Sequence, residues 1–345
     1  MSEPNQPQNP LQIPPPMALM QMIGGTWVSQ AVYVVAKLGI ADLLKDRPKS
    51  DRELAQATGT DARSLYRVLR ALASIGVFAE TEDGCFHLTP ISAHLLTGSP
   101  GSMRDIAIMF GEAFHWQPWG DILHSVKTGK TAFGHVFGME IFDYFTQNPE
   151  AGKIFDAAMT NFSVLLTATI VADYDFSSIR KIVDVAGGQG VLISNILKAH
   201  PTMQGVLFDL PETIEGSKAF IEAQGLSDRC ELVSGSFFES VPIGGDAYIM
   251  KNIIHDWDDE QAIAILKNCH NAMVENGKLL LLETVIEPGI QTSQAKFVDL
   301  EMLIVAGGRE RTEAEYRTLF AAAGFRLTNI FDTQANMNVI EGVRV

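Results

Sequence analysis

Cysteine is scarce in this sequence, and basic residues are outnumbered by acidic ones. The 345 residues include three cysteines, Cys85, Cys230 and Cys269, which form no Cys-x-x-Cys pair and leave one thiol over in any pairing. The sequence therefore predicts neither a disulfide framework nor a metal site, and it favours a reducing, cytoplasmic location.

Lysine and arginine total 26 against 41 acidic residues, which gives a net charge of −15. This charge repels phosphate backbones and argues against nucleic acid or an anionic membrane as the main partner.

A basic N-terminal segment followed by an uninterrupted apolar run is also missing. The most apolar N-terminal stretch, Met17 to Leu44, is interrupted by the polar residues Gln21, Gln30, Lys37 and Asp42. It predicts amphipathic helices that pack on a partner surface, and neither a signal peptide nor a membrane span. Residues 1–16, rich in proline and glutamine, predict a disordered tail.

With 46% hydrophobic residues, the chain can bury one large core and a smaller one, so two domains are expected. The first is predicted over residues 17–100. Ser50 and Glu53 form a capping box before a short helix, and Asp61 caps a second helix. The apolar face of that second helix comprises Leu65, Val68, Leu69, Leu72 and Ile75. Two short strands follow on either side of the turn at Thr81–Gly84, so the pattern predicts a winged-helix domain.

A winged helix can bind DNA through its second helix. Here that helix carries only three basic residues, Arg63, Arg67 and Arg70, and the rest of the chain is acidic. A helical dimerisation domain is therefore the favoured interpretation, and a DNA-binding regulator is the less favoured alternative.

Residues 101–165 predict a helical linker that is dense in aromatic side chains. Most of these fit an ordinary core, but aromatic and methionine side chains also hold planar ligands. The candidates for an acceptor pocket lie near His115 and Met159, together with Phe114 and Phe162.

Residues 166–345 alternate short apolar runs with amphipathic helices, a pattern typical of a parallel sheet. Five strands are expected, at 181–186, 205–210, 230–235, 246–251 and 278–283. Thr312 and Glu315 form another capping box. Two last strands, at 326–331 and 337–343, are close enough in sequence to pair as an antiparallel edge. The predicted fold class is α/β, a Rossmann-like, mostly parallel seven-stranded sheet with an N-terminal winged-helix domain.

The first of these strands leads into a glycine-rich turn. Asp184 is followed by Gly187, Gly188 and Gly190, and glycines there let backbone N–H groups approach a cofactor at the edge of the sheet. Asp209 ends the second strand and is placed to accept hydrogen bonds from a ribose diol. Enzymes that bind NAD and enzymes that bind S-adenosylmethionine share both features. The run AGGQG lacks the Gly-x-Gly-x-x-Gly spacing, which disfavours a nicotinamide dehydrogenase.

Catalytic candidates follow the next two strands. His255 comes shortly after Lys251, at the rim where a substrate would meet the cofactor. Glu283 ends a strand of four leucines, and such a carboxylate can hold an imidazole in one tautomer and stabilise its protonated form. Glu310, in the run GGRERT, is a second candidate; its alternative is an exposed salt bridge with a neighbouring arginine.

These motifs, in this order and spacing, resemble the plant-type (caffeate and hydroxyindole) O-methyltransferase family. The resemblance rests on VDVAGGQG, FDLP, GSFFESVP, DAYIMKNIIHDWDDE, LLLLE and GGRERTEAEYRTLFAAAGF, and it extends over nearly the whole chain from Met17. It implies S-adenosylmethionine as the methyl donor, S-adenosylhomocysteine as the product and a homodimer formed through the N-terminal domain.

The resemblance also implies roles for individual residues. His255 would be the general base, with Glu283 and Glu310 beside it. Asp256 would orient the substrate, and Met159 and Met302 would clamp its ring. The cofactor would be held by Ser163, Asp184, Gly187, Gly188, Gly190, Asp209, Leu210, Ser236, Phe237 and Lys251.

Two residues depart from the family pattern. Ala186 stands where the family usually has a glycine, and Ser236 stands where many members have an aspartate that contacts adenine. The tight turn can absorb the first change, whereas the second predicts weaker cofactor affinity.

The expected chemistry needs a base because a phenol with a pKa near ~10 is mostly neutral at pH 7. An ordinary imidazole, with a pKa near ~6.5, is mostly free to accept a proton. Some relatives with this fold bind the same cofactor without methylating, and the presence of His255 counts against that alternative. The identity of the acceptor, and O- versus N-methylation, stay open at this point.

Overall fold

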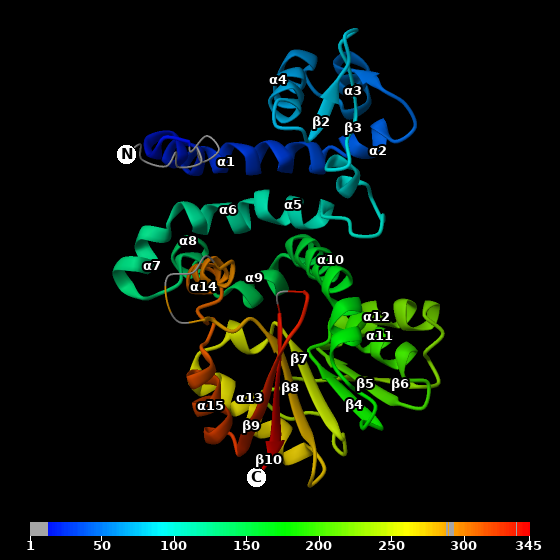
Figure 1. Ribbon diagram of the computed structural model, residues 1–345, viewed down its shortest axis with the longest axis vertical. Helices are drawn as coiled ribbons and strands as arrows, with labels where there is room; N and C mark the ends of the chain where they lie inside the picture. The colour runs from blue at the N-terminus through cyan, green and yellow to red at the C-terminus, as the bar shows by residue number, and fades with distance from the viewer. Residues whose placement is uncertain (1–12, 288, 290–292, 336) are drawn as a thin grey trace, which may run out of the picture. The chain divides into compact units, whose positions relative to one another are not determined.

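The computed structural model describes residues 13–287, 289, 293–335 and 337–345 (Figure 1). The described residues divide into two compact units, with the boundary between Gly111 and Glu112. Most of the predicted tail, residues 1–16, lies outside the described residues. Pro15 and Pro16 already form the first turn of helix α1 (Pro15–Lys37), because a proline at that position gives up an N–H that the helix does not use.

The first unit combines helices with a three-stranded sheet. Its further elements are α2 (Ile40–Leu44), β1 (Lys49–Ser50), α3 (Asp51–Thr58), α4 (Ala62–Ala73), β2 (Phe78–Glu80), β3 (Cys85–Leu88), the 3₁₀ helix η1 (Ser92–Leu95) and α5 (Arg104–Gly111). The capping box of Ser50 and Glu53 and the cap at Asp61 are present as predicted. Strand β3 pairs antiparallel with β1 and β2, so the winged-helix prediction is confirmed.

Two details of this unit differ from the predictions. Ile75 does not lie on the buried face of α4, because the helix ends at Ala73 and Ile75 is 51% exposed in the following turn. The first unit also extends past residue 100, since α5 packs against α1.

The second unit is built on a seven-stranded sheet in the order β6-β5-β4-β7-β8-β10-β9. All pairs from β6 to β8 are parallel, and β10 runs antiparallel to both of its neighbours. This confirms the predicted fold class. The strands are β4 (Lys181–Val185), β5 (Gln204–Asp209), β6 (Cys230–Ser234), β7 (Ala247–Lys251), β8 (Lys278–Glu283), β9 (Phe325–Asp332) and β10 (Asn338–Arg344).

Alternate side chains of these strands enter two hydrophobic cores, one on each face of the sheet. One core joins the strands to α13 (Asp259–Ala272) and α15 (Glu313–Ala322). The other joins them to α10 (Pro149–Asp173), α11 (Val191–Ala199) and α12 (Pro211–Ala223). The remaining elements are α6 (Ala113–Gly120), α7 (Ile122–Thr128), α8 (Ala132–Phe137), α9 (Ile141–Gln147), the 3₁₀ helix η2 (Ile254–Asp256) and α14 (Ala295–Ile304).

Candidate active site

The carboxyl ends of four parallel strands carry the polar residues predicted to form the site. Asp184 lies in β4, Asp209 ends β5, Lys251 ends β7 and Glu283 ends β8. Because these strands are parallel neighbours, the four side chains come from one edge of the sheet, where open α/β sheets bind their ligands.

The glycine-rich turn after β4 is tied to the end of β5. The Ala186 N–H donates to Phe208 O at 2.7 Å, and the Gly188 N–H donates to Asp209 Oδ2 at 2.8 Å. A side chain at Gly187 would place its Cβ 2.4 Å from Leu207 Cδ1, so only glycine fits there. Ala186 has a φ of 56°, a left-handed conformation that glycine adopts with less strain.

Asp184 is a buried carboxylate with one oxygen unused. It is 1% exposed, and its Oδ2 has no hydrogen-bond partner among the described residues. Burial raises the pKa of Asp184 to about 7, against the opposing effect of Lys251, and burial lowers the pKa of Lys251. A ligand with a cationic amino group would satisfy the free oxygen, so this end of the site fits the methionine part of S-adenosylmethionine.

The other predicted cofactor residues lie on the flanking segments. Leu210 is 53% exposed and its N–H donates to Asp209 Oδ1 at 2.7 Å. Ser236 Oγ accepts from the Phe238 N–H at 3.3 Å, and the Phe237 ring makes an edge contact with Trp257. Ser163, on α10, donates its hydroxyl to Met159 O at 2.9 Å, and within the described part of the chain its hydroxyl makes no hydrogen bond to the strand ends.

His255 lies in a cluster of three carboxylates. Its Nδ1 is 2.7 Å from Glu310 Oε1 and 3.6 Å from Glu283 Oε2, and its Nε2 is 3.7 Å from Asp256 Oδ1. Glu310 is 4% exposed, so the alternative of an exposed salt bridge is wrong for this residue. Arg309, its neighbour, pairs instead with Asp259 and Glu315.

Glu283 also fixes the backbone that carries the histidine. Its Oε1 accepts hydrogen bonds from the N–H groups of Ile253 and Ile254, at 3.1 and 2.8 Å. The turn that aims these groups at the carboxylate starts at Asn252, whose φ is 53°, and asparagine tolerates this conformation better than most residues. The direct hydrogen bond to the imidazole thus comes from Glu310, while Glu283 fixes the loop and acts on the imidazole through its charge.

The sequence pattern did not single out Arg311, which the structure places beside the candidate base. Its side chain is fully buried and donates to Ile254 O at 2.9 Å, to Trp257 O at 2.8 Å and to Asp259 Oδ1. These two carbonyl groups flank His255 on both sides. The guanidinium group therefore holds the loop of the candidate base in place.

The cluster changes the protonation of the histidine. Burial by itself lowers the pKa of His255, but the carboxylates of Glu283, Asp256 and Glu310 outweigh that effect and the pKa rises to about 10. Burial raises the pKa of Asp256 to about 6 and also raises the pKa of Glu283. In the protein without ligands the imidazole is therefore protonated at neutral pH, which differs from the ordinary value expected from the sequence.

A second polar group lies beside Asp256. Glu301 on α14 lies with its Oε1 2.9 Å from His115 Nε2, and its Oε2 accepts a hydrogen bond from Trp119 Nε1. The charge of Glu301 also contributes to the raised pKa of Asp256. The next residue, Met302, is 8% exposed, and Phe114 is buried with its ring edge-on to Phe145. Met159 and Phe162 lie on α10, and among the described residues no hydrogen bond or ring contact joins them to Glu301, Met302 or Phe114.

Comparison with known proteins gives the family. Residues 20–98 match the O-methyltransferase dimerisation domain, and residues 119–326 match the O-methyltransferase domain. The phenazine O-methyltransferase PhzM of Lysobacter antibioticus is 45% identical over 329 residues, which cover 95% of this chain and 96% of that protein.

Solved structures give the same result. A crystal structure of LaPhzM superposes with a TM-score of 0.94 at 44% identity, over 96% of this chain and all of that chain. The O-methyltransferase NcsB1, solved with S-adenosylmethionine and 2-hydroxy-5-methyl naphthoic acid, gives a TM-score of 0.80 at 30% identity, over 92% of this chain and 96% of that one.

The chain belongs to the O-methyltransferase family and is an S-adenosylmethionine-dependent O-methyltransferase of secondary metabolism. The resemblance inferred from the sequence motifs is confirmed, whereas a DNA-binding regulator and a non-methylating relative find no support. Helix α10 has the length and composition of a membrane span, but it lies inside the matched O-methyltransferase domain and is a helix of a soluble enzyme.

Proposed function

We propose that His255 is the general base of this methyltransferase and that it acts on a hydroxyl group of a small aromatic acceptor. The observation that carries the proposal is the 2.7 Å contact between His255 Nδ1 and Glu310 Oε1. With Nδ1 donating to Glu310, the lone pair of a neutral imidazole is on Nε2, the nitrogen nearer Asp256. Nε2 is then the atom that takes the hydroxyl proton.

The raised pKa of His255 suits a phenol. Proton transfer from a phenol with a pKa near ~10 to an ordinary imidazole is uphill by about 5 kcal/mol, whereas transfer to a base with a pKa of about 10 is nearly balanced. At pH 7 a base with a pKa of about 10 is almost entirely protonated, and making it neutral costs about 4 kcal/mol, so the bound cofactor has to bring the pKa of His255 to a value between about 7 and about 10. S-adenosylmethionine supplies the electrophilic methyl group and a positive charge, and a nearby positive charge favours the neutral imidazole. The carboxylates then stabilise the imidazolium as it forms.

The cofactor is expected to bind along the strand ends. Asp184 would take the amino group and Asp209 the ribose hydroxyls, while the N–H groups around Gly187, Gly188 and Gly190 line the approach. Lys251 would offset the acidic charge. Four further residues are proposed to contact the cofactor: Ser163, Leu210, Ser236 and Phe237.

The acceptor is proposed to be a planar hydroxylated ring without a carboxylate close to the reacting hydroxyl. One relative above is named for a phenazine and another was solved with a hydroxynaphthoic acid, and both compounds are fused aromatic systems. In this chain the carboxylates of Asp256 and Glu301 give a negative charge to the proposed acceptor pocket, and this charge would repel a carboxylate on the substrate. The remaining proposed lining consists of Phe114, His115, Met159, Phe162 and Met302.

A homodimer in the cytoplasm is the proposed working state. The described part of α1 exposes a row of apolar side chains, and a partner would cover them: Met17, Leu19, Met20, Met22, Ile23 and Trp27. All three cysteines are free, which suits a reducing compartment. Sedimentation should give a dimer for the wild type, and Trp27→Glu should shift the protein toward the monomer.

The proposed function is tested with labelled S-adenosylmethionine and a panel of hydroxylated phenazines and naphthalenes, with and without a neighbouring carboxylate. Wild type should methylate a hydroxyl, preferring acceptors without the carboxylate, and His255→Ala should lose most turnover while calorimetry shows unchanged cofactor affinity. Methylation of a ring nitrogen, or an unimpaired His255→Ala variant, would contradict the proposal.

A further inference from the structure

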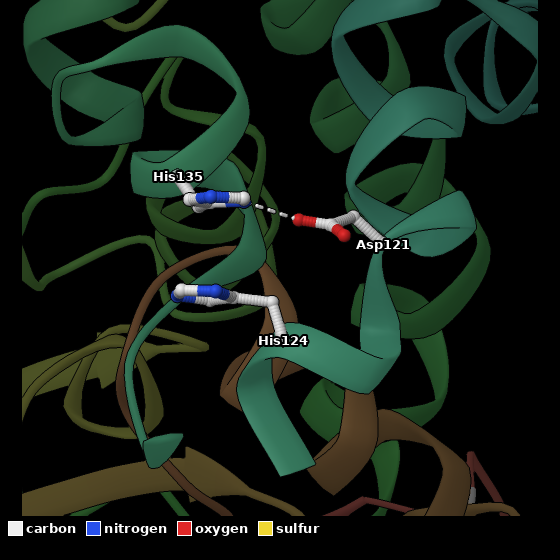
Figure 2. A group of neighbouring side chains, drawn as sticks. All are labelled: Asp121, His124 and His135. Carbon is white, nitrogen blue, oxygen red and sulfur yellow. Dashed lines mark hydrogen bonds and ion pairs between the residues drawn. The ribbon is translucent and has the colours of Figure 1, made fainter. Parts of the chain in front are cut away.

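A second group of potential ligand side chains lies on the helical part of the second unit, apart from the catalytic cluster. Asp121 directly precedes α7, His124 lies in the first turn of α7, and His135 lies on α8. Figure 2 shows the carboxylate of Asp121 directed at the ring of His135, with the ring of His124 lying parallel to that of His135. One ligand atom from each lies within 4.8 Å of the other two.

The local fold explains why these side chains meet. The His124 N–H donates to Asp121 O at 2.9 Å, which fixes the first turn of α7. Gly129, with a φ of 71°, ends α7, and Thr131 caps α8 two residues later. Residues 121–135 therefore bring the cluster together without a long-range contact, so little conformational entropy is lost on binding a ligand there.

The contacts inside the cluster leave donor capacity. His135 Nδ1 is 2.6 Å from Asp121 Oδ2, and the two imidazole rings stack with centroids 4.0 Å apart and planes 5° from parallel. Neither ring nitrogen of His124 has a hydrogen-bond partner within the described part of the chain. The ring nitrogens of His124 are therefore available as ligand atoms.

We propose that Asp121, His124 and His135 form a binding site for one divalent transition-metal ion. Two imidazole nitrogens and one carboxylate oxygen match the preferences of Zn²⁺, Co²⁺, Ni²⁺ and Cu²⁺ better than those of Mg²⁺ or Ca²⁺. The metal takes the place of the proton between Asp121 and His135. Metal–nitrogen bonds of about 2.0–2.1 Å require the rings to rotate out of the stack, and water completes the coordination. His135, with a side chain 56% exposed, has the freedom to turn.

The site would link α7 to α8 beside the catalytic loop. A Cβ on Gly307 would lie 3.1 Å from Thr131 Cγ2, so the turn before α8 contacts the segment that leads to Glu310. A bound metal is therefore expected to stabilise this part of the enzyme.

The test uses protein without a polyhistidine tag, freed of metal with a chelator and titrated with CoCl₂ and ZnCl₂. The expected result is one equivalent bound by calorimetry and a cobalt absorption spectrum typical of nitrogen ligands. His124→Asn and His135→Asn should each raise the Kd at least about tenfold, and His200→Asn, on a histidine outside the cluster, should leave it unchanged. Because protons compete with the metal ion for the same ligand atoms, binding should weaken as the pH is lowered.

The catalytic cluster of His255, Glu283 and Glu310 has a similar ligand set, so His255→Ala is included as a second control. Binding that survives in His255→Ala but is lost in His135→Asn supports the proposal. No binding at all, or binding lost only in His255→Ala, overturns it.

Discussion

Glu310 Oε1 lies 2.7 Å from His255 Nδ1, and this contact joins two residues that are 55 positions apart in the chain. Both side chains are almost completely buried. The pair connects η2, at the end of β7, to the segment that precedes α15. It orients the imidazole and, with Glu283 and Asp256, sets the charge around it.

Removing the charge of Glu310 should weaken the base. Glu310→Gln keeps a hydrogen-bond acceptor but removes one of the carboxylates that raise the pKa of His255, so that pKa should fall. Because His255 works as the neutral imidazole, the acidic limb of the pH profile of kcat should move to lower pH. The kcat itself should fall by about 10²-fold, because the imidazolium loses its partner. An unchanged pH profile would show that Glu310 has a structural role only.

Asp184 should have opposite effects on stability and binding. Its pKa is about 7 in the folded protein and 3.8 as the ordinary value, so the cofactor-free protein should lose stability as the pH rises from about 4 to about 7. Asp184→Asn removes the buried charge and should raise the free energy of unfolding at pH 8 by about 2 kcal/mol. The same change should weaken cofactor binding at least about tenfold. Urea unfolding measures the stability and calorimetry measures the cofactor affinity. If Asp184→Asn loses both stability and affinity, the buried charge of Asp184 does not destabilise the cofactor-free protein.

Ala186→Gly should stabilise the protein. A non-glycine residue in the left-handed region costs about 1–2 kcal/mol, which the substitution removes. Part of this gain is lost because glycine also increases the entropy of the unfolded chain. The net increase in the free energy of unfolding should be about 0.5 kcal/mol. Gly187→Ala is the matched opposite case, because its Cβ would clash with Leu207. Equal stabilities of wild type and Ala186→Gly in urea would argue that the turn carries no strain.

Arg311→Lys should damage both stability and turnover. A lysine ammonium group cannot reach Ile254 O, Trp257 O and Asp259 together, so buried acceptors lose their partners and the free energy of unfolding should fall by about 3 kcal/mol. Measured at a temperature where the variant is folded, kcat should fall while the cofactor Kd stays the same. A fall in stability with an unchanged kcat would limit Arg311 to a structural role.

The sequence predicts best those features that depend on near neighbours. The caps at Ser50, Asp61 and Thr312 and the strand end at Glu283 follow from short patterns, and the structure has all of them. Strand β4 continues one residue past Asp184, to Val185. The prediction that Ile75 lies on the apolar face of α4 was wrong, because the helical periodicity does not show that the helix ends two residues earlier, at Ala73.

Long-range contacts inside the site were harder to foresee. The choice between Glu283 and Glu310 as the partner of the imidazole depends on how the Asn252 turn directs two N–H groups at Glu283, which spacing alone does not reveal. Arg311 was missed because fully buried arginines are rare, so a charged run such as GGRERT suggests an exposed surface. Its position between two backbone carbonyls appears only in three dimensions.

The most direct test of the account follows methyl transfer by His255→Ala in single turnovers at saturating cofactor, from pH 6 to pH 10, beside wild type. Without the base, the rate should depend on the fraction of acceptor already ionised. It should therefore lie far below wild type at pH 7 and rise about tenfold per pH unit up to the pKa of the acceptor. A variant that matches the wild-type rate at pH 7, or whose deficit does not shrink as the acceptor ionises, would contradict the role of His255 as the general base.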